Sequence, residues 1–180
     1  MTNQSFQTSH IEAQLERKKT ELLFRSVGLA QLVNVFNASL LTYANVKMHA
    51  SATLGIIWWS IFAVIAGSRY LLARRFNRTK PDIEATKMWQ NFYLTGTVFG
   101  ALAWASGIVL FMRNAPDGSM LLTGLVVSGT IAGAIPVLAP VPVVFRTFTL
   151  LVSIPMTVIV LLQAHSPLYL SFGLMGDVPI

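Results

Sequence analysis

Five long apolar stretches, separated by short polar segments, set the pattern of this chain. A helix that crosses the ~30 Å hydrocarbon core of a bilayer needs about 20 predominantly apolar residues. Each stretch has about that length, so the sequence predicts an all-α, polytopic transmembrane helical bundle. The expected spans are near residues 22–43, 54–72, 92–111, 120–138 and 143–162.

A sixth stretch, near the C-terminus, is too short to cross a membrane. It covers residues 167–177, and only Leu168 to Gly176 is apolar before Asp177. That is roughly half the length of a crossing, and a charged side chain at mid-membrane depth is costly. We therefore expect an incomplete sixth span. This pattern favours a chain interrupted within that helix over a half-inserted or interfacial segment.

Residues 1–21 are mostly polar and lack the apolar core of a secretory signal. Ser9 and Glu12 have the S-x-x-E spacing of a capping box, and Ile11 and Leu15 follow at helical spacing. The segment therefore predicts a cytoplasmic, basic, amphipathic helix that begins near Ser9 and continues into the first span.

The cations fall almost entirely on one side of the membrane if the N-terminus is cytoplasmic. Only Lys47 and Arg113, of the 13 Lys and Arg residues, then lie on the outer side. The positive-inside rule favours this orientation, which predicts a multi-pass protein of the bacterial inner membrane. Cations at span ends can snorkel to the lipid head groups, and the expected interface anchors are Arg69, Arg74, Arg75 and Arg146.

The composition supports a membrane protein. Hydrophobic residues make up 54% of the chain and charged residues 11%, whereas a soluble domain has about 25% charged residues. The net charge of +6 comes from cations that flank apolar spans. The expected partner of these cations is therefore the anionic lipid bilayer, and not a nucleic acid.

The sequence contains no pattern of catalytic or metal-binding residues. All seven acidic residues lie outside the five spans, so no buried carboxylate is expected as a proton relay or a cation site. The chain has no cysteine, and its three histidines lack ligand partners. A nucleophile elbow and a phosphate-binding glycine loop are also missing. We therefore expect no enzyme activity, cofactor or metal in this chain.

Amide side chains form a polar stripe on the first span. On a helical wheel, Gln31 and Asn37 lie about 60° to either side of Asn34. Hydrogen bonding between helices is the ordinary role of such residues, and ligand recognition is the alternative. Hydroxyl groups on other spans could complete a pocket, or could bond to their own helix backbones. The candidate polar pocket consists of Gln31, Asn34, Asn37, Ser106, Ser128 and Thr130.

Small residues recur four apart on the third and fourth spans. Such spacing lets two helix backbones approach closely in lipid, so we expect these two helices to touch along their length. The same grooves would serve packing within one bundle or a homodimer interface. The residues expected to take part in helix packing are Gly96, Gly100, Gly107, Gly124, Gly129 and Gly133.

Prolines interrupt the last two spans. Pro136 lies at or near the end of the fourth span, and Pro155 lies well inside the fifth. Proline removes a backbone donor and kinks a helix, and neighbouring helices commonly satisfy the freed carbonyl. Both residues are expected kinks, either as fixed bends or as hinges.

Several segments together carry a family resemblance. They are residues 20–25 (TELLFR), 32–38 (LVNVFNA) and 69–76 (RYLLARRF), Trp89, and residues 132–139 (AGAIPVLA). Over about residues 19–172, the chain resembles the N-terminal multi-helix membrane regions of bacterial signalling proteins. Those regions precede cytoplasmic GGDEF or EAL domains, which make or degrade cyclic di-GMP, or histidine kinase modules.

The resemblance implies a sensory input domain: a bundle that dimerises or binds a small or lipidic ligand, and passes a change to an effector. This chain contains neither a GGDEF sequence nor a phospho-accepting histidine motif, so the effector is expected to be missing from it. Two other classes stay open. The amide stripe supports a small transporter or channel subunit, and the glycine grooves support a structural membrane assembly protein.

Overall fold

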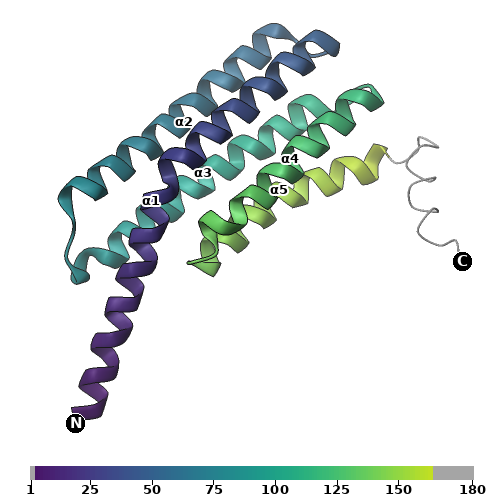
Figure 1. Ribbon diagram of the computed structural model, residues 1–180. Coiled ribbons are helices and arrows are strands. Elements are labelled where there is room, and N and C mark those ends of the chain that lie inside the picture. The colour runs from purple at the N-terminus through teal and green to yellow at the C-terminus, as the bar shows by residue number, and fades with distance from the viewer. Residues whose placement is uncertain (1–2, 164–180) are drawn as a thin grey trace, which may run out of the picture.

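The computed structural model describes residues 3–163, which form five α-helices and one short 3-10 helix joined by short connections. All five α-helices are long and apolar enough to cross a membrane, and they lie together in one elongated bundle (Figure 1). The predicted all-α bundle with five spans is therefore confirmed. The expected incomplete span over residues 167–177 lies outside the described residues. The helices are α1 (Asn3–Met48), α2 (Ala52–Thr79), η1 (Ile83–Ala85), α3 (Thr86–Met112), α4 (Asp117–Leu138) and α5 (Pro142–Gln163).

The basic N-terminal segment and the first span form one continuous helix, α1. This helix begins at Asn3, so Ser9 lies inside it and does not start it. The N-terminal part of α1 extends beyond the other four helices (Figure 1). The continuous backbone connects this projecting part directly to the part inside the bundle.

Gln90 of α3 holds α1 at the place where α1 enters the bundle. Its Nε2 atom donates hydrogen bonds to Thr20 Oγ1, at 2.8 Å, and to Glu16 Oε2, at 3.2 Å. Glu16 also pairs with Lys19, with an N–O distance of 2.7 Å. These contacts fix the angle at which α1 leaves the bundle.

Aromatic side chains form much of the core. The Phe24 and Phe76 rings stack with centroids 4.0 Å apart, and Tyr93 meets Phe24 edge-on at 5.2 Å. In the other half of the bundle, Trp58 is buried and its Nε1 donates to the Ala103 carbonyl at 2.8 Å. Buried indoles usually find such a partner, and this hydrogen bond joins α2 to α3.

Helix neighbours differ from the sequence expectation. α1 packs mainly against α2 and α4, and α3 packs mainly against α5 and α2. The contact between α3 and α4 is one of the smaller contacts in the bundle. The prediction that these two helices touch along their length is therefore wrong.

Side chains of α2 fill the glycine face of α3. A Cβ atom at Gly107 would lie 2.5 Å from Cζ2 of Trp58, and one at Gly96 would lie 3.2 Å from Cγ of Arg69. At Gly100 the nearest atom would be Nη1 of Arg69, at 3.4 Å. The small residues of α3 thus make room for an indole and a guanidinium, and not for the backbone of α4.

The glycines of α4 behave differently from one another. A Cβ atom at Gly124 would lie 3.4 Å from Cε of Met156 on α5, which is ordinary contact. At Gly129 and Gly133 no such atom lies within 4 Å. These two positions therefore face open space, although the sequence predicts that they pack against another helix. Pro136 follows them in α4, and Pro155 lies inside α5, so both prolines are within helices.

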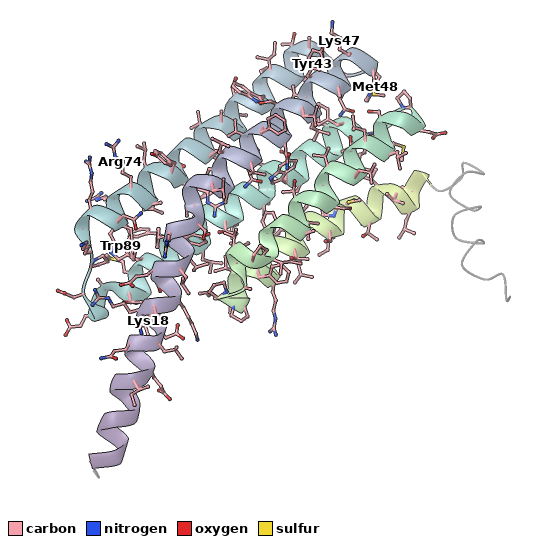
Figure 2. All side chains as sticks on the ribbon, viewed as in Figure 1. Lys18, Tyr43, Lys47, Met48, Arg74 and Trp89 are labelled. Carbon is pink, nitrogen blue, oxygen red and sulfur yellow. The ribbon has the colours of Figure 1, made fainter. Side chains whose placement is uncertain are left out.

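Charged groups separate along the length of the bundle. Lys18, Arg74 and Trp89 lie toward the end where α1 enters, whereas Tyr43 and Lys47 lie at the opposite end (Figure 2). Arg74, Arg75 and Arg146 are exposed, as expected of interface anchors. Arg69 is not, and it belongs to the site described next.

Candidate functional site

A cavity of about 620 Å³ lies between α1 and α4, with walls from α2, α3 and α5. This volume falls in the range of about 300–1,000 Å³ that is typical of small-molecule sites. Its lining is mainly apolar, with a small number of polar groups. The polar lining residues are Arg25, Ser26, Gln31, Asn34, Asn37, Arg69, Tyr93, Thr97 and Thr130.

The mouth of the cavity is marked by lining residues that are themselves exposed. On α1 these include Leu29 and Val33, and on α4 they include Gly129, Gly133 and Pro136. They lie within helices that are long and apolar enough to span a membrane. The cavity therefore opens sideways, between α1 and α4, at the surface that a membrane-spanning bundle turns toward lipid. The glycines of α4 create this opening, because a larger side chain at either position would fill it.

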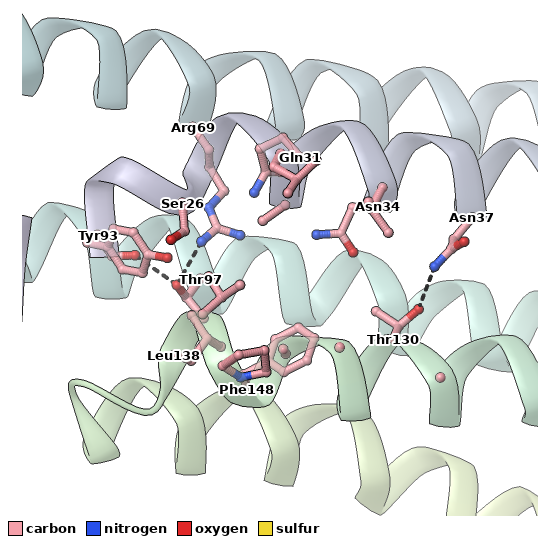
Figure 3. A pocket seen from close by; sticks show the side chains of 18 of the residues that line it. Ser26, Gln31, Asn34, Asn37, Arg69, Tyr93, Thr97, Thr130, Leu138 and Phe148 are labelled. Carbon is pink, nitrogen blue, oxygen red and sulfur yellow. Dashed lines mark hydrogen bonds between the residues drawn. The ribbon is translucent and has the colours of Figure 1, made fainter. Parts of the chain in front are cut away.

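Arg69 brings a positive charge into the cavity. Its Nη2 atom donates to Thr97 Oγ1 at 3.1 Å, and its guanidinium carbon lies 5.3 Å from the centroid of the Tyr93 ring (Figure 3). The space left by Gly96 and Gly100 on α3 accommodates the arginine stem. The prediction that Arg69 snorkels to the interface is therefore wrong: its side chain turns into the bundle because α3 provides a slot for it.

No carboxylate balances this charge within the described part of the chain. The cavity lining contains no Asp or Glu. The ion pairs found among the described residues, Arg17 with Glu21 and Lys19 with Glu16, lie on the N-terminal part of α1. Arg25 adds a second cation to the cavity lining, although a helical wheel places it opposite the amide stripe. The cavity is thus cationic at the end nearer the start of α1.

The amide stripe of α1 does face this cavity. Gln31 is buried and Asn34 is half-buried, and between residues 3 and 163 neither side-chain amide has a hydrogen-bond partner. Figure 3 shows both on the cavity wall, between Arg69 and Asn37. The amide atoms of Gln31 and Asn34 are not among the fully buried side-chain atoms that lack a partner, so they are accessible from the cavity that both residues line. Two accessible amides without a partner among the described residues are suited to bind a molecule inside the cavity.

Asn37 closes the far end of the cavity. Its Nδ2 atom donates to Thr130 Oγ1 of α4 at 3.3 Å (Figure 3). Beyond this contact, Asn45 Nδ2 donates to Thr123 Oγ1 at 3.3 Å, and the Ser119 hydroxyl donates to Asn45 Oδ1. These last three residues are fully buried. The polar stripe therefore continues past the cavity as a packed hydrogen-bonded seam between α1 and α4.

Two of the predicted pocket residues lie elsewhere. Ser106 and Ser128 are exposed and do not line the cavity, and the Ser106 hydroxyl donates to the Ala103 carbonyl of its own helix at 2.8 Å. The structure instead adds Tyr93 and Thr97 of α3, which the sequence pattern does not assign to the pocket. These residues are four apart, as neighbours on one helix face are, and the same face carries Gly96 and Gly100. The sequence signal for this face of α3 is Arg69, a basic residue near the end of the apolar run of α2. A cation within a membrane bundle needs polar partners on a neighbouring helix, and Thr97 is such a partner.

Neither a protein-family model, nor a curated protein, nor a solved structure matches this chain. The resemblance to the input regions of signalling proteins remains untested by them. Function must therefore be inferred from the cavity and from the way the helices surround it.

Proposed function

We propose that this chain is a membrane-embedded sensory input domain that binds a small or lipidic ligand in the cavity between α1 and α4. The observation that carries the proposal is a ligand-sized cavity with two unpaired amides on its wall. The family resemblance suggests the output: a cytoplasmic effector of the diguanylate cyclase, phosphodiesterase or histidine kinase type. Such an effector would read a change in helix position.

The same proposal assigns an orientation in the bacterial inner membrane, with the N-terminus in the cytoplasm. Supporting it, Lys18 and Arg74 lie at one end of the bundle and Lys47 at the other (Figure 2). Cytoplasmic segments carry an excess of Lys and Arg. In this orientation the cationic end of the cavity is near the cytoplasmic head groups.

A small transporter or channel subunit is the second candidate, because polar residues follow α1 from Gln31 to Asn45. The packing of that stripe weighs against it. Asn45, Thr123 and Ser119 are fully buried, and Asn45 bonds to the other two, so within residues 3–163 packed side chains close the polar stripe beyond the cavity. A site open at its side and closed at its inner end suits binding better than passage.

Distance measurements between spin labels test sensing. The chain has no cysteine, so paired substitutions place labels only at the chosen sites. Lys18→Cys with Arg146→Cys puts exposed labels on α1, which forms one side of the mouth, and on α5, which packs against α4 on the other side. Lys47→Cys with Arg113→Cys provides a control pair at the other end of the bundle. Each pair is reconstituted in phosphatidylcholine vesicles and measured alone, then with oleate, oleyl alcohol or phosphatidylglycerol.

A sensor should change the distance distribution of the first pair with at least one of these probes, while the control pair changes much less. Unchanged distributions with every probe would contradict sensing and favour a structural assembly protein. Solute flux above that of empty vesicles, measured in the same preparations, would favour the transporter.

A further inference from the structure

Arg69 is a cation inside a membrane bundle with no acidic partner among the described residues. A charged side chain in such a place is costly unless it is paired or hydrated. Its contacts, the Thr97 hydroxyl at 3.1 Å and the Tyr93 ring at 5.3 Å, are uncharged. These contacts hold the guanidinium in place, and they leave its charge uncompensated.

We propose that Arg69 is the anion-recognition centre of the cavity, and that the cavity takes an amphipathic molecule with a carboxylate or phosphate headgroup. This inference rests on the proposed function and defines its ligand class. In it, the headgroup pairs with the Arg69 guanidinium, and the hydrocarbon chain leaves the cavity through the mouth between α1 and α4.

The headgroup chemistry follows from the donors that surround the cationic end. A guanidinium offers a planar fork of N–H donors that matches two oxygens of a carboxylate or phosphate. Thr97 uses one donor of Arg69 and so orients the fork (Figure 3). The Gln31 and Asn34 amides supply further N–H donors on the same wall, and Arg25 lies in the lining as a second cation. A neutral headgroup would leave this charge unmatched.

The chain chemistry follows from the other walls. Leu29 and Val33 of α1, Val137 and Leu138 of α4 and Phe148 of α5 give an apolar lining. From Arg25 to Asn37 the cavity face of α1 extends roughly 18 Å at about 1.5 Å per residue, enough for a headgroup and part of an acyl chain. Because the mouth faces sideways, an amphiphile can enter from the bilayer while its chain stays in hydrocarbon.

Equilibrium binding to the purified chain in neutral detergent tests this inference. Tryptophan fluorescence is a suitable readout, since Trp104 lies with Arg69 in the wall of a small adjoining gap. Oleate and dodecyl phosphate supply both headgroup and chain, oleyl alcohol supplies the chain alone, and acetate and inorganic phosphate supply the headgroup alone. We expect the two anionic amphiphiles to bind much more tightly than the other three probes.

Three variants locate the binding. Arg69→Gln should weaken binding of oleate and dodecyl phosphate by about ten- to a hundredfold, the range for a lost charged hydrogen bond. Arg74→Gln removes an exposed charge from the same helix and should leave binding unchanged. Gly133→Leu keeps Arg69 and puts a side chain into open space, so it should fold normally and still block binding.

The outcomes separate this inference from the proposed function. If oleate and oleyl alcohol bind equally, and Gly133→Leu blocks both, the cavity binds ligands but Arg69 does not select anions. The same holds if Arg69→Gln binds oleate as well as the wild type does. If no probe binds and Gly133→Leu has no effect, both ideas fail. Acetate or phosphate binding as tightly as oleate would overturn the amphipathic ligand.

A last comparison distinguishes two sources of the headgroup. Oleate binding is repeated in nanodiscs of phosphatidylcholine and of phosphatidylglycerol. Binding lost only in phosphatidylglycerol would identify a membrane phospholipid as the occupant, and binding kept in both would identify a free lipidic acid. Both results support anion recognition at Arg69.

Discussion

At the scale of single residues, each glycine of the bundle has a role set by what faces it. Gly107 lies under the Trp58 indole, which donates a hydrogen bond to the neighbouring Ala103 carbonyl. Gly129 faces the open cavity. The two helices share the same small-residue spacing. Adding a methyl group is nevertheless expected to lower the stability of the protein at Gly107 and not at Gly129.

We therefore expect Gly107→Ala to destabilise the protein by about 1–3 kcal/mol, the usual cost of overpacking. The new Cβ would lie 2.5 Å from a buried, hydrogen-bonded ring that cannot easily move. Gly129→Ala is the matched control, and it should be neutral or stabilising by up to about 1 kcal/mol, because Ala favours a helix over Gly. Thermal unfolding in detergent measures both variants. An equal loss of stability would show that the indole does not determine the effect.

At the scale of helices, contacts between segments far apart in sequence decide what each helix does. Gln90 of α3 donates to Thr20 and Glu16 of α1, and this is where the projecting part of α1 meets the bundle. The position of that part relative to the spans depends on few side chains.

Gln90→Ala should loosen this attachment while leaving the rest of the bundle intact. We expect faster amide hydrogen exchange over residues 11–22 and little change near Asn45 or Trp104. Asn91→Ala, the next residue on α3 and an exposed one, is the control and should change neither region. Unchanged exchange in Gln90→Ala would mean that packing around Phe24 alone holds α1.

The sequence predicts the helices well and the site only partly. The five spans follow from length and hydrophobicity, which are local properties of the chain. The faces of Gln31, Asn34 and Asn37 follow from the helical period. The position of the Arg69 side chain does not follow from the sequence. It depends on glycines of α3 that pack against α2, and the sequence does not specify that these two helices are neighbours.

The same limit explains the wrong prediction for the glycine grooves. Small residues on two successive spans indicate that other groups approach these helices closely. They do not indicate whether those groups belong to the backbone of a neighbouring helix or to its side chains. In this bundle an indole and a guanidinium occupy the groove of α3, and empty space lies over Gly129 and Gly133. Only the arrangement of all five helices distinguishes a packing surface from a binding site.

At the scale of the whole molecule, the separation of charges between the two ends predicts a topology. A reporter inserted after Lys80 should report the cytoplasm, and one inserted after Pro116 should report the outer side. Lys80 follows the cluster of arginines at the end of α2, and Pro116 lies in the turn before α4. The reverse pattern would place the cationic end of the cavity near the outer leaflet and contradict the assigned orientation.

Because α1 is one unbroken helix, a rotation of its part inside the bundle would also move its projecting part. Asn37, bonded to Thr130, ties α1 to α4 at the far end of the cavity. At about 1.5 Å per residue, Arg25 lies roughly 18 Å from Asn37 along the helix, and Asn3 lies roughly 50 Å from Asn37. Opening the mouth by pivoting a rigid α1 about Asn37 would break the Gln90 hydrogen bonds to Thr20 and Glu16. It would then move the projecting tip about three times as far as it widens the entrance. If an amphiphile opened the mouth in this way, the larger movement of the tip would be the change in helix position that the proposed effector reads.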